Sequence, residues 1–190
     1  MTAYSTVKRV ILAVDDPTER KVRFMALLSS ALPKGEERPV LTGGSAIEVY
    51  LDGTLRSGDM DIVYRRQDLE KVIRAWRFTL GGGLRSWIND ELMIAIDMVG
   101  EELSGSYDKV TTITTDYGQA VVIGVEDLIL KRLASAKFWG VVSDMEQAFL
   151  LARAREDDVD WEYLNNGAKV AGTEDYLAKL EGMLKPDSQG

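Results

Sequence analysis

Two patterns of hydrophobic and polar residues follow one another along this chain. From about residue 40 to residue 125, short apolar segments with the two-residue period of β-strands alternate with helical segments. Beyond residue 125, apolar residues recur only at helical spacing. We therefore predict an α/β (α+β) core over residues 1–124, in which a mixed β-sheet is flanked by helices. A C-terminal helical region is expected over residues 125–190.

The individual elements are predicted from their period and their boundary residues. Strands are expected over residues 40–42, 59–64, 84–89, 92–99, 110–115 and 120–125. Helices are expected from Asp16-Pro17 to just before Pro33 and over residues 45–51, 68–80, 127–138, 143–154, 161–170 and 173–184. Residues 5–14 are compatible with either a helix or an edge strand, and the pattern leaves both open.

Two residue types are missing from the 190-residue chain, cysteine and histidine. Their absence excludes disulfides, thiolate zinc sites, cysteine nucleophiles, serine–histidine–aspartate triads and histidine-ligated metals. Any bound metal must therefore be held by oxygen ligands, chiefly carboxylates. Such ligands favour hard ions such as Mg²⁺, Mn²⁺ or Ca²⁺.

The net charge of −8 argues against a general nucleic-acid coat protein, although it is compatible with one basic groove. No apolar run approaches the roughly 18 residues that a membrane span requires. The N-terminus lacks the apolar stretch and cleavage site of a secretory signal. We therefore expect a cytoplasmic protein without a membrane partner.

The segment Gly43-Gly44-Ser45 follows a predicted strand and opens a predicted helix. Glycine lets the backbone approach an anion, and the free N–H groups at a helix N-terminus point toward it. Ser45 could cap its own helix, donate to a phosphate oxygen, or do both. The pattern therefore indicates a phosphate-binding turn, with an ordinary loop-to-helix connection as the alternative.

Three aspartates are the strongest candidates for metal chemistry. Asp59 and Asp61 are two residues apart in a predicted strand, so both carboxylates project from one face. Two such anions repel each other unless a cation lies between them. Asp97 is a single acid in an apolar strand, where burial is costly without a metal or hydrogen bonds. The alternatives are a solvated strand face and a solvated strand end.

In order and spacing, these motifs resemble those of the nucleotidyltransferase superfamily that includes DNA polymerase β. In that family, Gly-Ser opens a helix after a strand, Asp-x-Asp lies on the next strand, and a later strand carries a third acid. Arg56-Ser57-Gly58 also looks like the segment before the acid pair in small bacterial and archaeal members, including the abortive-infection toxin group. The resemblance covers roughly residues 38–124 and, more loosely, the helix that contains Lys131.

The resemblance implies a transfer of a nucleoside monophosphate from a nucleoside triphosphate (NTP) to a hydroxyl group, with Mg²⁺ or Mn²⁺ as cofactor. Asp59 and Asp61 would bind the metal. Asp97 would complete a second metal site and help to deprotonate the acceptor, so all three acids are predicted as catalytic and metal-binding residues. The residues expected to bind the nucleotide are Gly43, Gly44, Ser45, Arg56 and Lys131.

Several alternatives stay open. Arg56 and Lys131 are also compatible with solvated surface charges. A non-catalytic nucleotide-binding protein, a toxin–antitoxin partner and a structural interaction module would all retain the same fold. The preferred NTP, the acceptor (RNA, protein or small molecule) and a homo-oligomeric state are not specified by the residues.

Overall fold

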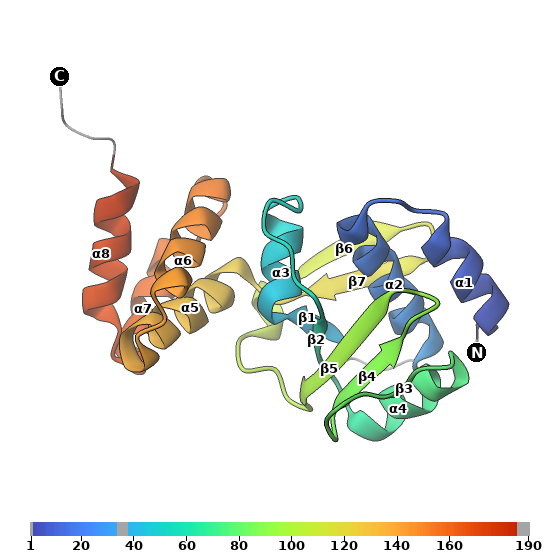
Figure 1. The fold of residues 1–190 in the computed structure, drawn as a ribbon. Helices are drawn as coiled ribbons and strands as arrows, with labels where there is room; N and C mark the ends of the chain where they lie inside the picture. The colour runs from blue at the N-terminus through green and yellow to red at the C-terminus, as the bar shows by residue number, and fades with distance from the viewer. Residues whose placement is uncertain (1, 34–37, 186–190) are drawn as a thin grey trace. The chain divides into compact units, whose positions relative to one another are not determined.

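The computed structural model describes residues 2–33 and 38–185 (Figure 1). The chain divides between Ile123 and Gly124 into two compact units. Over the described residues, the first unit combines a β-sheet with helices, and the second is helical throughout. The α/β class predicted from the sequence is confirmed.

In the first unit, α2 begins where the local sequence predicts, whereas α3 and α4 each begin two residues before their predicted starts. The Asp16 side chain accepts a hydrogen bond from the Glu19 N–H at 2.8 Å, and Pro17 occupies the first position of α2. α3 begins directly after β1, at Gly43. The bounds are α1 Tyr4–Leu12, α2 Pro17–Ala31, α3 Gly43–Tyr50 and α4 Arg66–Ala75, and a short 3₁₀ helix, η1, covers Tyr107–Lys109.

In the described part of the chain, seven strands form one sheet in the order β3-β4-β5-β2-β1-β7-β6. β1 is parallel to β7 and β2 is parallel to β5, whereas the other neighbouring strands are antiparallel. The strands carrying the predicted chemistry, β1, β2 and β5, are therefore neighbours. The bounds are β1 Val40–Thr42, β2 Met60–Val63, β3 Thr79–Leu80, β4 Ser86–Asn89, β5 Ile94–Gly100, β6 Thr111–Thr115 and β7 Gly118–Val122.

One half of this sheet has a buried face and a partly open face. In β5, Ile96 and Met98 are buried, whereas Asp97 and Val99 are partly exposed. In β4, the side chain of Trp87 is buried next to Ile96 in the strand register. Because side chains alternate along a strand, Asp97 lies on the face opposite to this apolar layer.

Aromatic side chains complete the core beside α2. The Phe24 ring centroid lies 5.7 Å from that of Trp76 and 5.6 Å from that of Phe78. The indole N–H of Trp76 donates a hydrogen bond to the Thr2 carbonyl at 3.0 Å, so its polar atom is satisfied although the ring is fully buried.

Two sequence-based expectations change in the structure. Residues 5–14 lie largely in α1, which resolves the choice between helix and strand in favour of a helix. The helix predicted over residues 68–80 is wrong at its C-terminal end, since α4 stops at Ala75 and Thr79–Leu80 forms the edge strand β3. Arg77 adopts φ +62°, and the Phe78 N–H bonds back to the Ile73 carbonyl at 3.0 Å. This reversal directs Phe78 into the core against Phe24.

The second unit has its own apolar core. Buried leucines from each of the four helices described in this unit contribute to it, among them Leu133, Leu151, Leu164 and Leu177. A polar pair lies in the same unit: the Tyr163 hydroxyl donates to Asp127 at 2.7 Å. Burial, together with this hydrogen bond, raises the pKa of Tyr163 to about 12. The bounds are α5 Val125–Trp139, α6 Val142–Ala154, α7 Trp161–Ala171 and α8 Glu174–Leu184.

Among the helices that the structure describes, the longest are α2 and α5, with 15 residues each. A membrane-spanning helix needs about 20 predominantly apolar residues. Over residues 2–33 and 38–185, no helix has the length and apolarity to span a bilayer.

Candidate functional site

Four polar side chains lie in one row across adjacent strands. Thr42 of β1 is paired with Asp61 of β2, Asp61 with Asp97 of β5, and Asp97 with Ser86 of β4. Directly paired residues project from the same face of a sheet, with Cβ atoms about 5 Å apart. The structure therefore brings Asp61 and Asp97 together, although they are far apart in the sequence.

Gly43 lies against this row at the start of α3. Its φ of +61° is in the left-handed region, and a Cβ at this position would lie only 1.8 Å from Oδ2 of Asp61. The Asp61 carboxylate thus occupies the space that a side chain would need. The Gly43, Gly44 and Ser45 N–H groups are the first three of α3, and the first four N–H groups of a helix lack partners within that helix. The turn therefore combines a glycine backbone, a helix N-terminus and a carboxylate.

Asp97 is oriented by two neighbours that the sequence analysis did not identify. The Ser86 hydroxyl donates to Oδ1 of Asp97 at 2.7 Å. The Nε of Arg85 lies 3.7 Å from Oδ2 of the same carboxylate, and the Arg85 side chain is 62% exposed. Asp97 therefore has a fixed hydrogen bond on one oxygen and a solvated cation near the other.

Asp59 lies one residue before β2, in the exposed loop that follows Arg56. Its carboxylate accepts a hydrogen bond from the Ser57 hydroxyl at 3.4 Å, and its backbone carbonyl accepts one from the same hydroxyl at 3.1 Å. Unlike Asp61 and Asp97, Asp59 is therefore held by its own loop and not by the strand register.

Ser45 occupies a different environment from the one that its motif suggests. The side chain is fully buried, and its hydroxyl donates to the Asp59 carbonyl and accepts from the Lys21 ammonium at 3.0 Å. The hydroxyl therefore links α3 to the loop before β2. Its backbone N–H remains part of the helix N-terminus described above.

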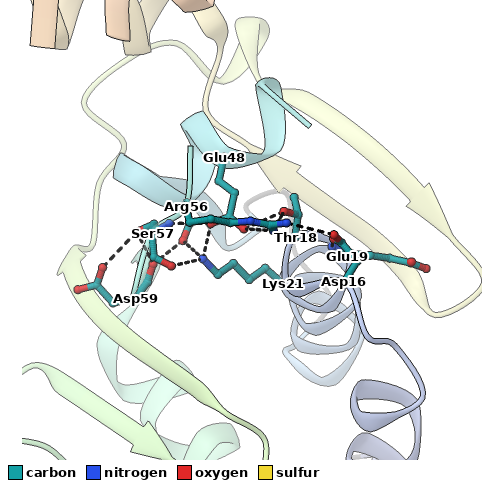
Figure 2. A network of polar contacts seen from close by, with 9 residues as sticks. Asp16, Thr18, Glu19, Lys21, Glu48, Arg56, Ser57 and Asp59 are labelled. Atoms are coloured by element: carbon teal, nitrogen blue, oxygen red, sulfur yellow. Dashed lines mark hydrogen bonds and ion pairs between the residues drawn. The ribbon is translucent and has the colours of Figure 1, made fainter. Parts of the chain in front are cut away.

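A charged network surrounds this link, and Figure 2 shows the Lys21 side chain reaching toward Glu48 and Ser57. Glu48 is fully buried, with Oε2 2.6 Å from Nζ of Lys21 and Oε1 3.1 Å from Nη1 of Arg56. Burial by itself would raise the pKa of Glu48, but hydrogen bonds from Lys21, the Ser57 N–H and Thr18 together hold the pKa below its ordinary value.

The sequence contained a signal for Glu48 but none for Lys21. Glu48 is a single acid within an apolar helical segment, which indicates a buried and partnered carboxylate. Lys21 is 27 residues away from Glu48, and it lies on a different helix. Only the packing of α2 beside α3 shows that the two residues form a pair.

The remaining predicted residues are not members of this row. Arg56 is paired with Glu48 and, at 3.4 Å, with Asp16, and its side chain is 49% exposed. Lys131 lies on α5 in the second unit, so a nucleotide contact by this residue stays a prediction. Gly44 is close to the loop instead: a Cβ there would lie 2.8 Å from the Ser57 hydroxyl.

The acids do not form a complete metal cage in the described part of the chain. Within it, no group of three or more acidic side chains is close enough to hold a metal ion. Asp61 and Asp97 offer two carboxylates on one face of the sheet. Mg²⁺ is commonly held by one or two carboxylates together with substrate phosphates and water. The residues therefore fit a metal that arrives with a phosphorylated ligand.

Comparison with known proteins adds no further constraint, because no family model, no curated protein and no solved structure matches the chain.

Proposed function

We propose that this protein binds an NTP together with Mg²⁺ or Mn²⁺ and transfers the nucleoside monophosphate to a hydroxyl acceptor. The supporting observation is the juxtaposition of Gly43, Asp61 and Asp97. A glycine turn at a helix N-terminus suits the phosphates, and two carboxylates in strand register suit a hard cation. The acceptor is RNA, a protein or a small molecule.

In this proposal the glycine turn binds the phosphates, and the two paired acids serve the metal and the proton transfer. The N–H groups of Gly43, Gly44 and Ser45 bind the triphosphate. Asp61 and Asp97 would hold the metal, with Asp59 beside them on the loop before β2, and the metal would supply charge neutralisation at the phosphates. The acceptor oxygen forms a bond to the α-phosphorus, the bond from that phosphorus to the β-phosphate oxygen breaks, and pyrophosphate leaves. Asp97, oriented by Ser86, accepts the acceptor's proton.

A thermal melt with each of ATP, GTP, CTP and UTP in the presence of Mn²⁺ tests this proposal. A ligand at about 100 times its dissociation constant stabilises the folded state by about 2.7 kcal/mol. We expect such a shift in the wild type and loss of its metal-dependent part in Asp61→Asn and Asp97→Asn. Asp116→Asn, in the exposed turn between β6 and β7, removes the same charge away from the row and serves as the control.

The outcome that contradicts the proposal is a set of melting curves that superimpose with and without Mn²⁺ and nucleotide. Transfer itself is tested by pyrophosphate release from the nucleotide that gives the largest shift, with cellular RNA or lysate as the acceptor source. Release that persists in Asp61→Asn would assign the activity to a contaminant.

Nucleotide binding without transfer is the second candidate function, and one contact favours it. Arg85 lies next to Asp97 and offers this carboxylate a cation within the chain itself. A protein that shows the Mn²⁺-dependent shift but releases no pyrophosphate with any acceptor source would have this binding function. A role as a toxin–antitoxin partner would belong to the same class.

A further inference from the structure

One ammonium group connects α2, α3 and the loop before β2. The Nζ of Lys21 donates to the Ser45 hydroxyl at 3.0 Å, to Oε2 of Glu48 at 2.6 Å and to the Ser57 carbonyl at 2.7 Å (Figure 2). An ammonium group has three N–H donors, and these three acceptors match that number. Lys21 is only 9% exposed, so these hydrogen bonds are shielded from water.

The acceptors of Lys21 are themselves bonded to the loop. The Ser57 N–H donates to Oε2 of Glu48 at 2.9 Å, and the Ser45 hydroxyl donates to the Asp59 carbonyl. Ser57 is therefore attached at both its N–H and its carbonyl, by Glu48 and Lys21 respectively. This arrangement determines where the loop can lie on α3.

The same loop borders the proposed nucleotide site. A Cβ on Gly44 would lie only 2.8 Å from the Ser57 hydroxyl oxygen, and this hydroxyl donates to the Asp59 carbonyl. Asp61 follows two residues after Asp59, beside Gly43. A shift of the loop would therefore move Asp59 and change the space over the glycine turn.

We propose that Lys21 is a positioning residue of the nucleotide site: it fixes the loop 57–59 on α3 and thereby sets the relative position of Asp59 and the Gly43-Gly44 turn. The expected effect of Lys21 on nucleotide binding rests on the proposed function. The attachment of the loop is independent of that function and can be measured separately.

The experiment compares Lys21→Met with two controls on the full chain. Hydrogen exchange at the Ser57 amide should become faster in Lys21→Met, because the Glu48 carboxylate that this amide bonds loses its main partner. Calorimetric titration with Mn²⁺ and ATP at low temperature, where each variant is folded, should show affinity weakened by about 10- to 100-fold, as is typical for loss of a supporting partner.

The controls separate positioning from charge and from stability. Lys71→Met removes an exposed lysine on α4, and Leu28→Ala destabilises the core on the same helix as Lys21. Both should keep the wild-type affinity and the wild-type exchange at Ser57. Equal weakening in Leu28→Ala and Lys21→Met would reduce Lys21 to a purely structural role and overturn the proposal.

Further outcomes distinguish the two proposals. If the wild-type protein binds no nucleotide with Mn²⁺, the proposed function is refuted. Faster exchange at Ser57 in Lys21→Met would then still support the attachment of the loop by Lys21. Unchanged exchange at Ser57 overturns the inference whatever the wild type binds. If Lys21→Met does not fold, Lys21→Arg is used in its place. Arginine keeps the positive charge beside Glu48, but its planar guanidinium group cannot direct three N–H donors from one nitrogen to the three acceptors. A folded Lys21→Arg with wild-type exchange and affinity also overturns it.

Discussion

Gly43 meets two separate constraints at a single backbone position. Its φ of +61° is unfavourable for any residue with a Cβ, and that Cβ would lie 1.8 Å from Oδ2 of Asp61. Gly140 has a similar φ of +67°, and the described residues leave open space around it. Comparison of the two glycines therefore separates backbone strain from the close approach of Asp61.

We expect Gly43→Ala to lower the free energy of unfolding by more than Gly140→Ala. The left-handed conformation costs a non-glycine residue about 1–2 kcal/mol at both sites. At Gly43, displacement of Asp61 adds roughly 1–3 kcal/mol, the usual range for overpacking. Urea denaturation of the two variants measures the difference. Equal losses would show that the Asp61 carboxylate moves aside without cost.

Glu48 makes stability depend on pH in a predictable direction. Its pKa in the folded protein lies below the ordinary value of 4.5, because its hydrogen bonds outweigh burial. A group with a lowered folded pKa stabilises the protein above its unfolded pKa, and this contribution is lost as the pH falls through the folded pKa. The contribution of Glu48 is thus complete at neutral pH and decreases below about pH 4.5.

At pH 7, Glu48→Gln should lower the free energy of unfolding by about 3 kcal/mol, because it leaves the Lys21 ammonium buried without its counter-charge. The difference from the wild type should shrink as the pH falls below 4.5, the ordinary value for this carboxyl group. Urea denaturation across the pH range measures both quantities. Glu102→Gln, at an exposed position, should change little at any pH. A pH-independent difference would show that the charge of Glu48 is not the cause.

At the scale of elements, turns decide how the strands around the site are paired. The β4–β5 connection aligns Ser86 with Asp97, so its geometry places the hydroxyl that orients this acid. Met93 in this connection has φ +54° and is 63% exposed. Met93 therefore adopts a backbone conformation that favours glycine, and its exposed side chain makes little packing to offset the strain.

We expect Met93→Gly to raise the free energy of unfolding by about 1 kcal/mol, the strain of a left-handed residue. Met183→Gly, at a 42% exposed position in α8, should instead lower it by about 1 kcal/mol, since glycine destabilises a helix. Thermal unfolding of the two variants gives opposite shifts if this reasoning holds. A destabilised Met93→Gly protein would show that the Met93 side chain contributes more than its exposure suggests.

At the scale of the whole molecule, the division at Ile123 and Gly124 separates two compact units, each with its own buried apolar residues. The candidate row lies entirely in the first unit, on the central strands of the sheet. Leu164 is fully buried in the second unit, whereas Val170 on the same helix is 92% exposed. The second unit thus offers a matched pair of positions for testing its core.

We expect Leu164→Asp to unfold the second unit, because a buried charge without a partner costs about 3 kcal/mol or more. Val170→Asp should leave the melting curve unchanged. In Leu164→Asp, far-UV circular dichroism should show that only part of the helical signal is lost. The helices of the first unit should stay folded, because that unit has its own core. Loss of the entire signal in one transition would show that the two units unfold as one.

The sequence by itself determined the class of the fold, the approximate position of almost every element and the residue types available for chemistry. These properties depend on local periods and boundary residues, such as the Asp16 cap of α2 and the two glycines at the start of α3. It also placed Asp61 and Asp97 correctly on strands, whereas its placement of Asp59 in the same strand as Asp61 was wrong. Their convergence could not be derived, because strand order depends on contacts between distant segments.

Only the tertiary structure decided which of these residues meet. The register of β2 beside β5 pairs Asp61 with Asp97, and Asp59 lies outside the strand. The packing of α2 against α3 buries Ser45 and joins Lys21 to Glu48. The helical spacing of apolar residues continues to residue 80, but α4 ends at Ala75 because the chain turns so that Phe78 packs against Phe24 in the core. In each case the free energy of burial or pairing comes from a partner that is far away in the chain, so no local pattern contains it.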